Sequence, residues 1–139
     1  MKHPLQALLI APIRKMREDV LAGSKQITIR DGHRDYRLGG VMLCCPDKPW
    51  CVAADITVVR HTTYGEIVEE EYKADGFLSP QEMIEGMRRF YPYADFDKPA
   101  TVIRWNNVHG KLVDQYHKRQ AKKLSKHQKA CCGKGPYKG

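Results

Sequence analysis

The chain has 139 residues, 42% of them hydrophobic and 29% charged, and its formal net charge is +8. This length and composition are typical of one globular domain with a modest core, and no stretch is apolar enough to span a bilayer. The apolar run at residues 5–13 is short and lacks a small-residue cleavage pattern, so we expect no signal peptide. Residues 1–110 hold 15 basic and 15 acidic residues, whereas residues 111–139 hold 9 basic and 1 acidic residue, so the positive charge belongs to the C-terminal segment.

A strand and a helix open the chain. Residues 5–10 are apolar and predict a buried strand. Apolar side chains then recur at three- and four-residue steps, which predicts a helix. It should begin at Pro12, which suits a first helical turn, and end at Gly23, which tolerates a left-handed turn.

After the helix, the residues change period at once to the alternation of a strand. Ile27 and Ile29 fall on one side of it, and Thr28 and Arg30 fall on the other. Lys25 lies where the chain bends into this strand. We therefore expect one strand face in the core and one face toward a polar partner.

The rest of the domain is predicted to contain three more strands and two helices. Polar residues 31–40 predict a loop. Residues 41–45, 51–61 and 101–105 predict strands, and the acidic residues 64–74 predict a helix.

The second of these helices has the clearest start signal in the sequence. Residues 79–82 hold a serine, a proline at the first helical position and a glutamate, which is a capping box. Leu78 and Met83 are spaced for a hydrophobic staple beside it. We expect the helix to run to Phe90 and to bury Met83, Met87 and Phe90.

Residues 21–31, LAGSKQITIRD, resemble the signature of the ASCH family, small PUA-like β-barrel proteins tied to RNA and modified nucleosides. Within that family the run is most similar to the small bacterial acetylcytidine amidohydrolases. The resemblance continues more weakly over residues 4–105. It implies an α/β (α+β) fold for residues 1–110, a small PUA-like mixed β-barrel with two or three flanking helices. Residues 111–139 are then a basic C-terminal tail, partly helical or disordered.

The resemblance also implies a catalytic group. In the amidohydrolases the matching lysine and threonine are regarded as the activating base and the nucleophile, which places these roles at Lys25 and Thr28. A threonine hydroxyl needs such a base, and a lysine becomes one when burial or a nearby cation, here Arg30, favours the free amine. The family's glutamate aligns, across a one-residue gap, with the shorter Asp75, which would protonate the leaving amine. The alternative is that the family's glutamate is missing from this chain. This chemistry requires no cofactor and no metal.

The cooperation of Lys25 and Thr28 stays open at the level of sequence. Residues three apart in a regular strand point to opposite faces, so the pair works only if the chain turns at Ser24 and Lys25. The alternative is that Thr28 packs on a β-face and Lys25 is solvated in a turn. Asp75, one methylene shorter than glutamate, could also misplace a general acid by about an ångström.

Arg30, His33 and Arg37 are the predicted substrate-binding residues. Guanidinium groups and aromatic rings at a barrel mouth suit a phosphate and a base, and Arg34 and Tyr36 lie in the same loop. Arg30 belongs to the end of the strand and is assigned to the pocket. For the loop residues the alternative is a solvent-exposed, charged surface without a binding role.

Other residues that can carry chemistry receive structural interpretations. The five cysteines lack the two-residue gap of a metal knuckle, so we expect no metal site and free thiols in a reducing cytoplasm. The acidic run 66–71 is predicted to be a solvated helix face, although its glutamates are alternative acids to Asp75. Tyr91 and Trp105 are assigned to the core rather than to ligand stacking.

The basic segment is the second functional feature of the sequence. Its cations suit a polyanion bound without sequence readout, and the alternative is a solubilising terminus. The leading hypothesis is a monomeric, cytoplasmic amidohydrolase that removes an acyl group from a modified nucleoside such as acetylcytidine. One competing hypothesis is a non-catalytic RNA- or modified-base-binding module with a basic arm. The other is a ribonuclease, for which the sequence offers Lys25, His33 and Asp75 but no diagnostic pair of histidines.

Overall fold

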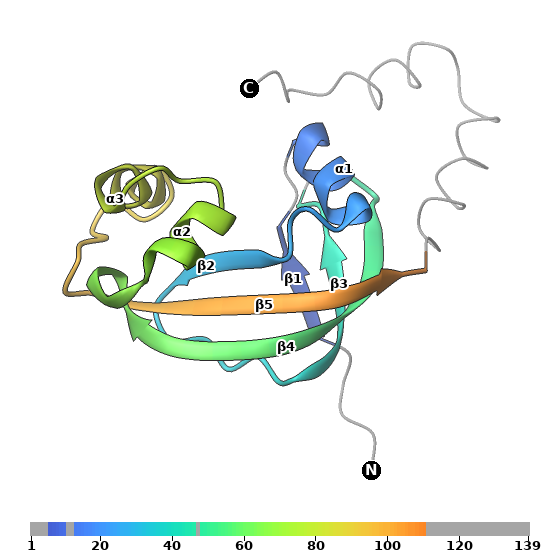
Figure 1. The fold of residues 1–139 in the computed structure, drawn as a ribbon. Coiled ribbons are helices and arrows are strands. Elements are labelled where there is room, and N and C mark those ends of the chain that lie inside the picture. Colours follow the sequence, from blue (N-terminus) through green and yellow to red (C-terminus); the bar gives the residue numbers. More distant parts are fainter. Residues whose placement is uncertain (1–5, 11–12, 47, 111–139) are drawn as a thin grey trace. The chain divides into compact units, whose positions relative to one another are not determined.

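The computed structural model describes residues 6–10, 13–46 and 48–110. The predicted tail, residues 111–139, therefore lies outside the described residues. In chain order the elements are β1 (Gln6–Leu9), α1 (Arg14–Ala22), β2 (Ile27–Asp31), β3 (Gly39–Cys44), β4 (Cys51–Thr63), the short 3-10 helix η1 (Tyr64–Glu66), α2 (Glu69–Ala74), α3 (Pro80–Arg88) and β5 (Pro99–His109) (Figure 1).

The strands belong to one sheet with the order β1-β3-β4-β5-β2. β1 pairs in parallel with β3, from Gln6 opposite Val41 to Leu9 opposite Cys44. β2 pairs antiparallel with β5, from Ile27 opposite Arg104 to Asp31 opposite Ala100. The sheet is therefore mixed, and the predicted small α+β class with two or three short helices is confirmed.

The chain divides into two compact units. The first comprises the described parts of residues 1–24, 40–55 and 107–139, and the second comprises residues 25–39 and 56–106. The first unit holds β1, α1, β3 and the start of β4. Its buried apolar side chains are Leu8, Ile10, Val20, Val41, Leu43, Cys45, Trp50, Val52 and Ala54.

The end of α1 follows the sequence prediction. Gly23 adopts the left-handed conformation, with φ of 83°. Its N–H donates to the Val20 carbonyl at 3.2 Å, and the Ser24 N–H donates to the Asp19 carbonyl at 2.9 Å. These two bonds satisfy carbonyls that a helix end leaves without partners. Pro12, the predicted start, lies outside the described residues.

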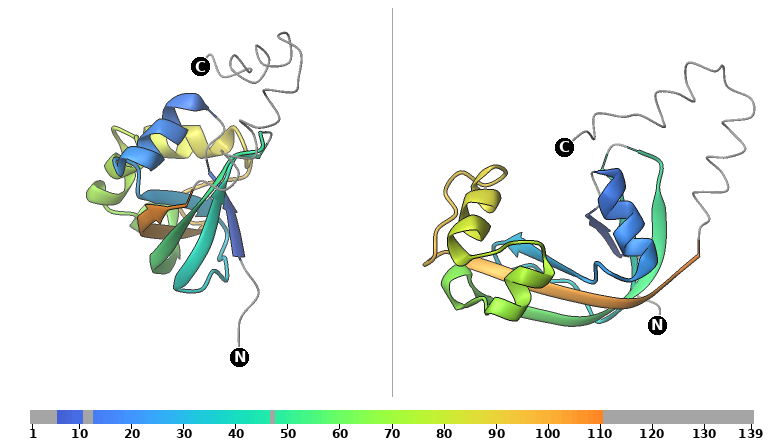
Figure 2. Two further views of the ribbon diagram at one scale, coloured as in Figure 1. Left: turned by 90° about the vertical axis from the view of Figure 1, so that its right-hand side faces the viewer. Right: turned by 45° about the horizontal axis from the view of Figure 1, so that its top comes forward.

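The second unit holds β2, most of β4 and β5, and the remaining helices. α2 contacts both β2 and α3, and the two helices lie next to each other in every view (Figures 1 and 2). Because strand side chains alternate, Ile27 and Ile29 point to one face of β2 and pack with the neighbouring face of β5. The buried cluster on that face consists of Ile27, Ile29, Tyr64, Ile67, Tyr72, Met83, Ile84, Met87, Ala94, Ala100 and Val102.

The predicted helix starting at Ser79 forms, with two corrections. The Ser79 hydroxyl accepts the Glu82 N–H at 3.1 Å, and Met83 and Met87 are buried as expected. Leu78 is exposed, so the predicted staple to Met83 is wrong. Phe90 is 74% exposed because α3 ends at Arg88, before Phe90 could reach the core.

The acidic segment is also less uniform than predicted. The helix expected over residues 64–74 breaks at Ile67 and Val68, between η1 and α2. Glu71 is buried rather than solvated, and its carboxylate pairs with Arg60, with Arg60 Nε 3.1 Å from Oε2. Its Oε1 also accepts the Val68 N–H at 3.0 Å. Glu71 therefore holds the start of α2 against β4 instead of facing water.

Cys44 and Cys51 form a disulfide that joins the end of β3 to the start of β4. The expectation of free thiols is therefore wrong for these two cysteines. The turn between the strands brings the side chains together, which their spacing in the sequence did not reveal. Cys45 is free and buried, and the pair at residues 131–132 lies outside the described residues.

Candidate functional site

Lys25 and Asp75, fifty positions apart in the sequence, meet in the second unit. Lys25 directly precedes β2, and Asp75 caps the C-terminus of α2. The Lys25 Nζ atom lies 2.6 Å from Asp75 Oδ1, and the two side chains are only 11% and 10% exposed. The packing of α2 against β2 thus creates a buried amine–carboxyl pair from the two residues that the resemblance placed in one site.

The pair lies on the outer edge of β2. β2 is the last strand in the sheet order, and Gln26 and Gly32 bond to β5 on its inner edge. The carbonyl and N–H groups of Ile27 and Ile29 point the other way, because these directions alternate along a strand. Lys25 Nζ donates to the Ile27 carbonyl at 2.9 Å, and Asp75 accepts a backbone hydrogen bond from Ile29. The pair therefore satisfies backbone groups that an edge strand would otherwise leave open.

The surroundings of Asp75 make its carboxyl group a weaker acid than it would be in water. Burial raises the pKa of Asp75, because a carboxylate loses hydration when it leaves water. Lys25, the guanidinium of Arg30 and the Ile29 backbone oppose this effect without cancelling it. Moving the proton from Lys25 to Asp75 would leave a free amine beside a carboxylic acid, which are the base and the acid that acyl transfer uses.

Thr28 is buried on β2 and lies opposite Ile103 of β5. It points to the face opposite Ile27 and Ile29, as the alternation predicted. Within the described part of the chain its hydroxyl has no hydrogen-bond partner, and Lys25 Nζ contacts Ile27 and Asp75 instead. The structure joins Lys25 to Asp75, whereas the cooperation of Lys25 with Thr28 stays a prediction.

Arg30 is half-buried and shares the strand face of Thr28. Burial lowers the pKa of Arg30, and Tyr91, Tyr36 and Asp75 act in the opposite direction. The guanidinium is therefore close enough to Asp75 for each to influence the other. Its assignment to the pocket stays a prediction.

His33 and Arg37 lie in the loop between β2 and β3, and both are exposed. His33 Nε2 is 3.0 Å from the Thr62 carbonyl, and its ring stacks on His61 with centroids 4.7 Å apart. His61 Nε2 is in turn 2.8 Å from the Arg34 carbonyl. A carbonyl only accepts, so both Nε2 atoms carry protons. Sequence reasoning missed His61, since nothing in its local pattern links β4 to this loop.

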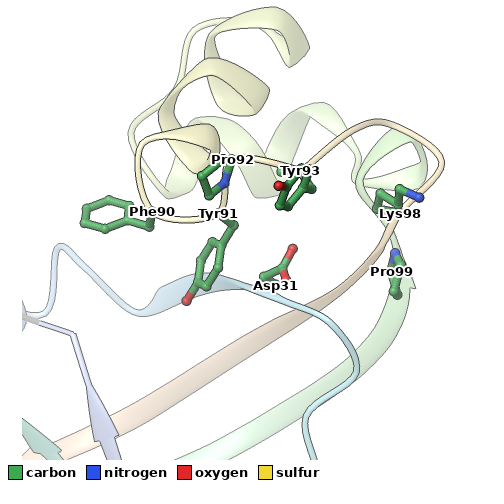
Figure 3. Close-up of a pocket in the computed structure, with 8 residues that line it drawn as sticks. Asp31, Phe90, Tyr91, Pro92, Tyr93, Lys98 and Pro99 are labelled. Atoms are coloured by element: carbon green, nitrogen blue, oxygen red, sulfur yellow. The ribbon is translucent and has the colours of Figure 1, made fainter.

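A cavity of about 450 Å³ opens at the far end of β2 (Figure 3). Phe90 and Tyr93 border it, and these rings are 74% and 89% exposed. The sequence interpretation placed Phe90 and Tyr91 in the core and gave the cavity no role. The complete lining is Asp31, Phe90, Tyr91, Pro92, Tyr93, Ala94, Lys98 and Pro99.

The cavity lining excludes Lys25, Thr28 and Asp75, but Arg30 connects the two places electrostatically. Tyr91 lines the cavity and is also the strongest influence opposing the effect of burial on the pKa of Arg30. Asp31 follows Arg30 directly, and its Oδ1 accepts the Tyr64 hydroxyl at 2.7 Å. Burial and this hydrogen bond raise the pKa of Tyr64, so its hydroxyl remains a donor to Asp31.

Three comparisons bear on the identity of the chain. No protein-family model, no curated protein and no solved structure matches it. Within residues 6–10, 13–46 and 48–110, no cluster of histidine, cysteine, aspartate or glutamate is placed to hold a metal ion. None of the helices described is long and apolar enough to cross a membrane.

Proposed function

We propose that this protein is an amidohydrolase that removes an acyl group from a modified nucleoside such as acetylcytidine. The observation that carries the proposal is the buried contact between Lys25 Nζ and Asp75 Oδ1 at 2.6 Å. Its support is that the resemblance to the ASCH amidohydrolases implies one site for both residues, with Lys25 matched within residues 21–31 and Asp75 matched across a one-residue gap. A buried amine and carboxyl in hydrogen-bond contact are also typical of acid–base sites.

In the proposed reaction the Thr28 hydroxyl oxygen attacks the acyl carbon. Its proton passes to the amine of Lys25, and Asp75 gives its own proton to the exocyclic nitrogen as the carbon–nitrogen bond breaks. The Lys25 ammonium then returns its proton to the Asp75 carboxylate across their 2.6 Å contact. Water attacks the acyl-threonine ester with the free amine of Lys25 as base, and the resulting ammonium protonates the Thr28 oxygen as the acid leaves. Arg30 orients the substrate and balances the negative charge that develops on the acyl oxygen.

The competing explanation is structural. Lys25 and Asp75 cover the outer edge of β2, and that role alone could account for their burial. The shorter aspartate, in the position of the family's glutamate, also sets the acid further from a leaving group. A rate measurement separates the two explanations, because an edge cover needs no Thr28 hydroxyl.

The proposal is tested by incubating the full chain with acetylcytidine and following cytidine release by chromatography. The wild type should turn over, and Thr28→Ala should be inactive because the nucleophile is gone. Lys25→Ala and Asp75→Asn should lose roughly 10²- to 10⁴-fold in kcat. Thr28→Ser, which keeps the hydroxyl, should retain part of the activity.

Matched controls are Thr63→Ala and Lys73→Ala, which remove a hydroxyl and an amine elsewhere in the second unit. Thr63 bonds Glu66 at 3.2 Å and Lys73 pairs with Glu69 at 3.1 Å, so neither belongs to the site. Both should match the wild-type rate. A wild type that leaves acetylcytidine intact, or a Thr28→Ala variant that keeps its rate, would refute the hydrolase.

A binding module is the second candidate, and the exposed rings of Phe90 and Tyr93 favour it. Exposed aromatic rings beside cations are typical of surfaces that stack bases. In this function the basic tail would supply affinity for RNA. Binding of labelled RNA that weakens as salt rises, in a protein without hydrolytic activity, would select it.

A ribonuclease is less well supported. The structure supplies the histidine pair that the sequence lacked, His33 with His61, but the Nε2 atom of each ring faces a backbone carbonyl.

The proposed setting for either function is the cytoplasm, with the protein a monomer. The Cys44–Cys51 disulfide opposes a reducing compartment, and a thiol count on protein purified without reductant decides whether it forms there.

A further inference from the structure

The cavity at the end of β2 exposes aromatic surface that the fold itself does not use. Phe90 and Tyr93 follow the end of α3 and are 74% and 89% exposed, although rings of this size normally contribute strongly to a core. They are concentrated around one concave site of about 450 Å³, within the range of small-molecule pockets. Clustered exposure of this kind marks a binding surface more often than chance.

The polar groups of the cavity carry opposite charges. Asp31 uses only Oδ1 for the Tyr64 hydroxyl, and within the described residues its Oδ2 accepts no hydrogen bond. The ammonium of Lys98 likewise forms no hydrogen bond or ion pair within that part of the chain. Figure 3 shows Asp31 projecting from the end of β2 toward the segment that carries Tyr91 and Tyr93. A ligand that fits must be flat, must donate a hydrogen bond and must carry an anionic group.

A pyrimidine nucleotide has these three features. Its base is planar and stacks on aromatic rings, and its exocyclic amine or ribose hydroxyl can donate to Asp31. Its phosphate can pair with Lys98. A quaternary ammonium ligand, which aromatic rings and a carboxylate would also suit, is disfavoured by the Lys98 charge at the same site.

We infer that this cavity binds a pyrimidine base with an attached phosphate, as a mononucleotide or as a nucleotide within RNA, between the Phe90–Tyr93 segment and Asp31. The choice of a pyrimidine rests on the proposed function. Arg30 is within electrostatic range of both Tyr91, which lines this cavity, and Asp75. On the proposed function, the cavity and the Lys25–Asp75 pair serve two parts of one substrate. The preferred substrate is then a phosphorylated nucleotide rather than the free nucleoside.

The test is isothermal titration of the full chain at low salt with cytidine, cytidine 5′-monophosphate and a cytidylate tetranucleotide. Phe90→Ala and Tyr93→Ala should each raise the Kd of every probe by about tenfold, since each removes one stacking ring. Lys98→Gln should raise the Kd of the monophosphate by about fivefold and leave that of cytidine unchanged. Equal affinity for the monophosphate and the tetranucleotide supports a mononucleotide ligand, and tighter tetranucleotide binding with the same Phe90 dependence supports RNA.

Leu78→Ala and Lys73→Gln are the matched controls, because both residues are exposed and neither lines the cavity. Absence of saturable monophosphate binding overturns the inference. So does an unchanged Kd in Phe90→Ala and Tyr93→Ala, or an equal loss for cytidine and the monophosphate in Lys98→Gln. Binding of the monophosphate by a protein inert toward acetylcytidine keeps the cavity and rejects the hydrolase. Hydrolysis of acetylcytidine with an unchanged KM in Phe90→Ala supports the hydrolase and rejects the cavity as a binding site.

Discussion

At the scale of single residues, Lys25 and Asp75 form a buried ion pair whose strength depends on both members being present. Removing one partner leaves the other charge in a site with little water, which costs about 3 kcal/mol in comparable pairs. We expect Lys25→Met to lower the free energy of unfolding by about that amount. The double variant Lys25→Met/Asp75→Asn should lose less than the sum of the two single variants, because no charge is stranded. Urea unfolding of all four proteins measures the coupling, and strictly additive losses would contradict it.

The raised pKa of Asp75 gives a second residue-scale prediction, with a definite sign. The unfolded chain loses this proton near the ordinary carboxyl pKa of 3.8, whereas the folded protein keeps it to higher pH. Between those values the folded state binds more protons, so stability falls as pH rises. The stabilising contribution is complete below pH 3.8 and is lost as pH rises through the folded pKa. Wild type should therefore lose stability relative to Asp75→Asn across this window.

This pH dependence is measured by urea unfolding of wild type and Asp75→Asn at intervals from about pH 3.5 to 7. The other carboxyl groups are common to both proteins and cancel in the difference. If the free energy of unfolding of the wild type rises relative to that of Asp75→Asn as pH increases, the Lys25 charge outweighs burial at this site.

At the scale of elements, the Cys44–Cys51 disulfide ties β3 to β4 across a short turn. Closing a loop of this length should stabilise the folded state by about 2 kcal/mol, chiefly by restricting the unfolded chain. Reductant should therefore lower the free energy of unfolding of the wild type by about 2 kcal/mol. The Cys44→Ser/Cys51→Ser variant is the control and should not respond. An equal response in both proteins would assign the effect to a different disulfide.

At the scale of the whole molecule, the charge is unevenly distributed, because the excess of +8 falls in residues 111–139. If this segment binds RNA through its cations, each phosphate contact releases counterions and steepens the salt dependence. Replacing Lys122, Lys123 and Lys126 by glutamine should reduce the slope of log Kd against log salt by about 2 for single-stranded RNA. The slope is measured by fluorescence anisotropy between about 50 and 200 mM salt.

The control for the tail replaces three lysines among the described residues, Lys15, Lys48 and Lys73, by glutamine. This variant has the same net charge as the tail variant, so general electrostatics cannot explain a difference between them. If both sets change the slope equally, the tail has no special part in binding. An unchanged slope in the tail variant would likewise show that the tail does not contribute to RNA binding.

Local patterns were enough to predict most elements. The change of period after Gly23 predicted the step from α1 to β2, because backbone geometry sets both periods within a few residues. Ser79 predicted the start of α3 because a cap bonds to a backbone N–H three residues away. The predicted contact of Leu78 with Met83 and the predicted burial of Phe90 were wrong. The burial of both side chains depends on the path of the chain beyond them, and α3 ends at Arg88.

The sequence by itself determined the order of strands and helices and the uneven charge. The resemblance of residues 21–31 made Lys25 and Thr28 candidates, and a gapped alignment outside that run added Asp75. These follow from neighbours in the chain, so a linear pattern contains them. Only the tertiary structure decided that Lys25 meets Asp75, that Cys44 bonds Cys51, that Glu71 is buried, and that Phe90 and Tyr93 border a cavity. Each of these depends on segments that come together when helices and turns pack on the sheet, and spacing along the chain does not set such distances.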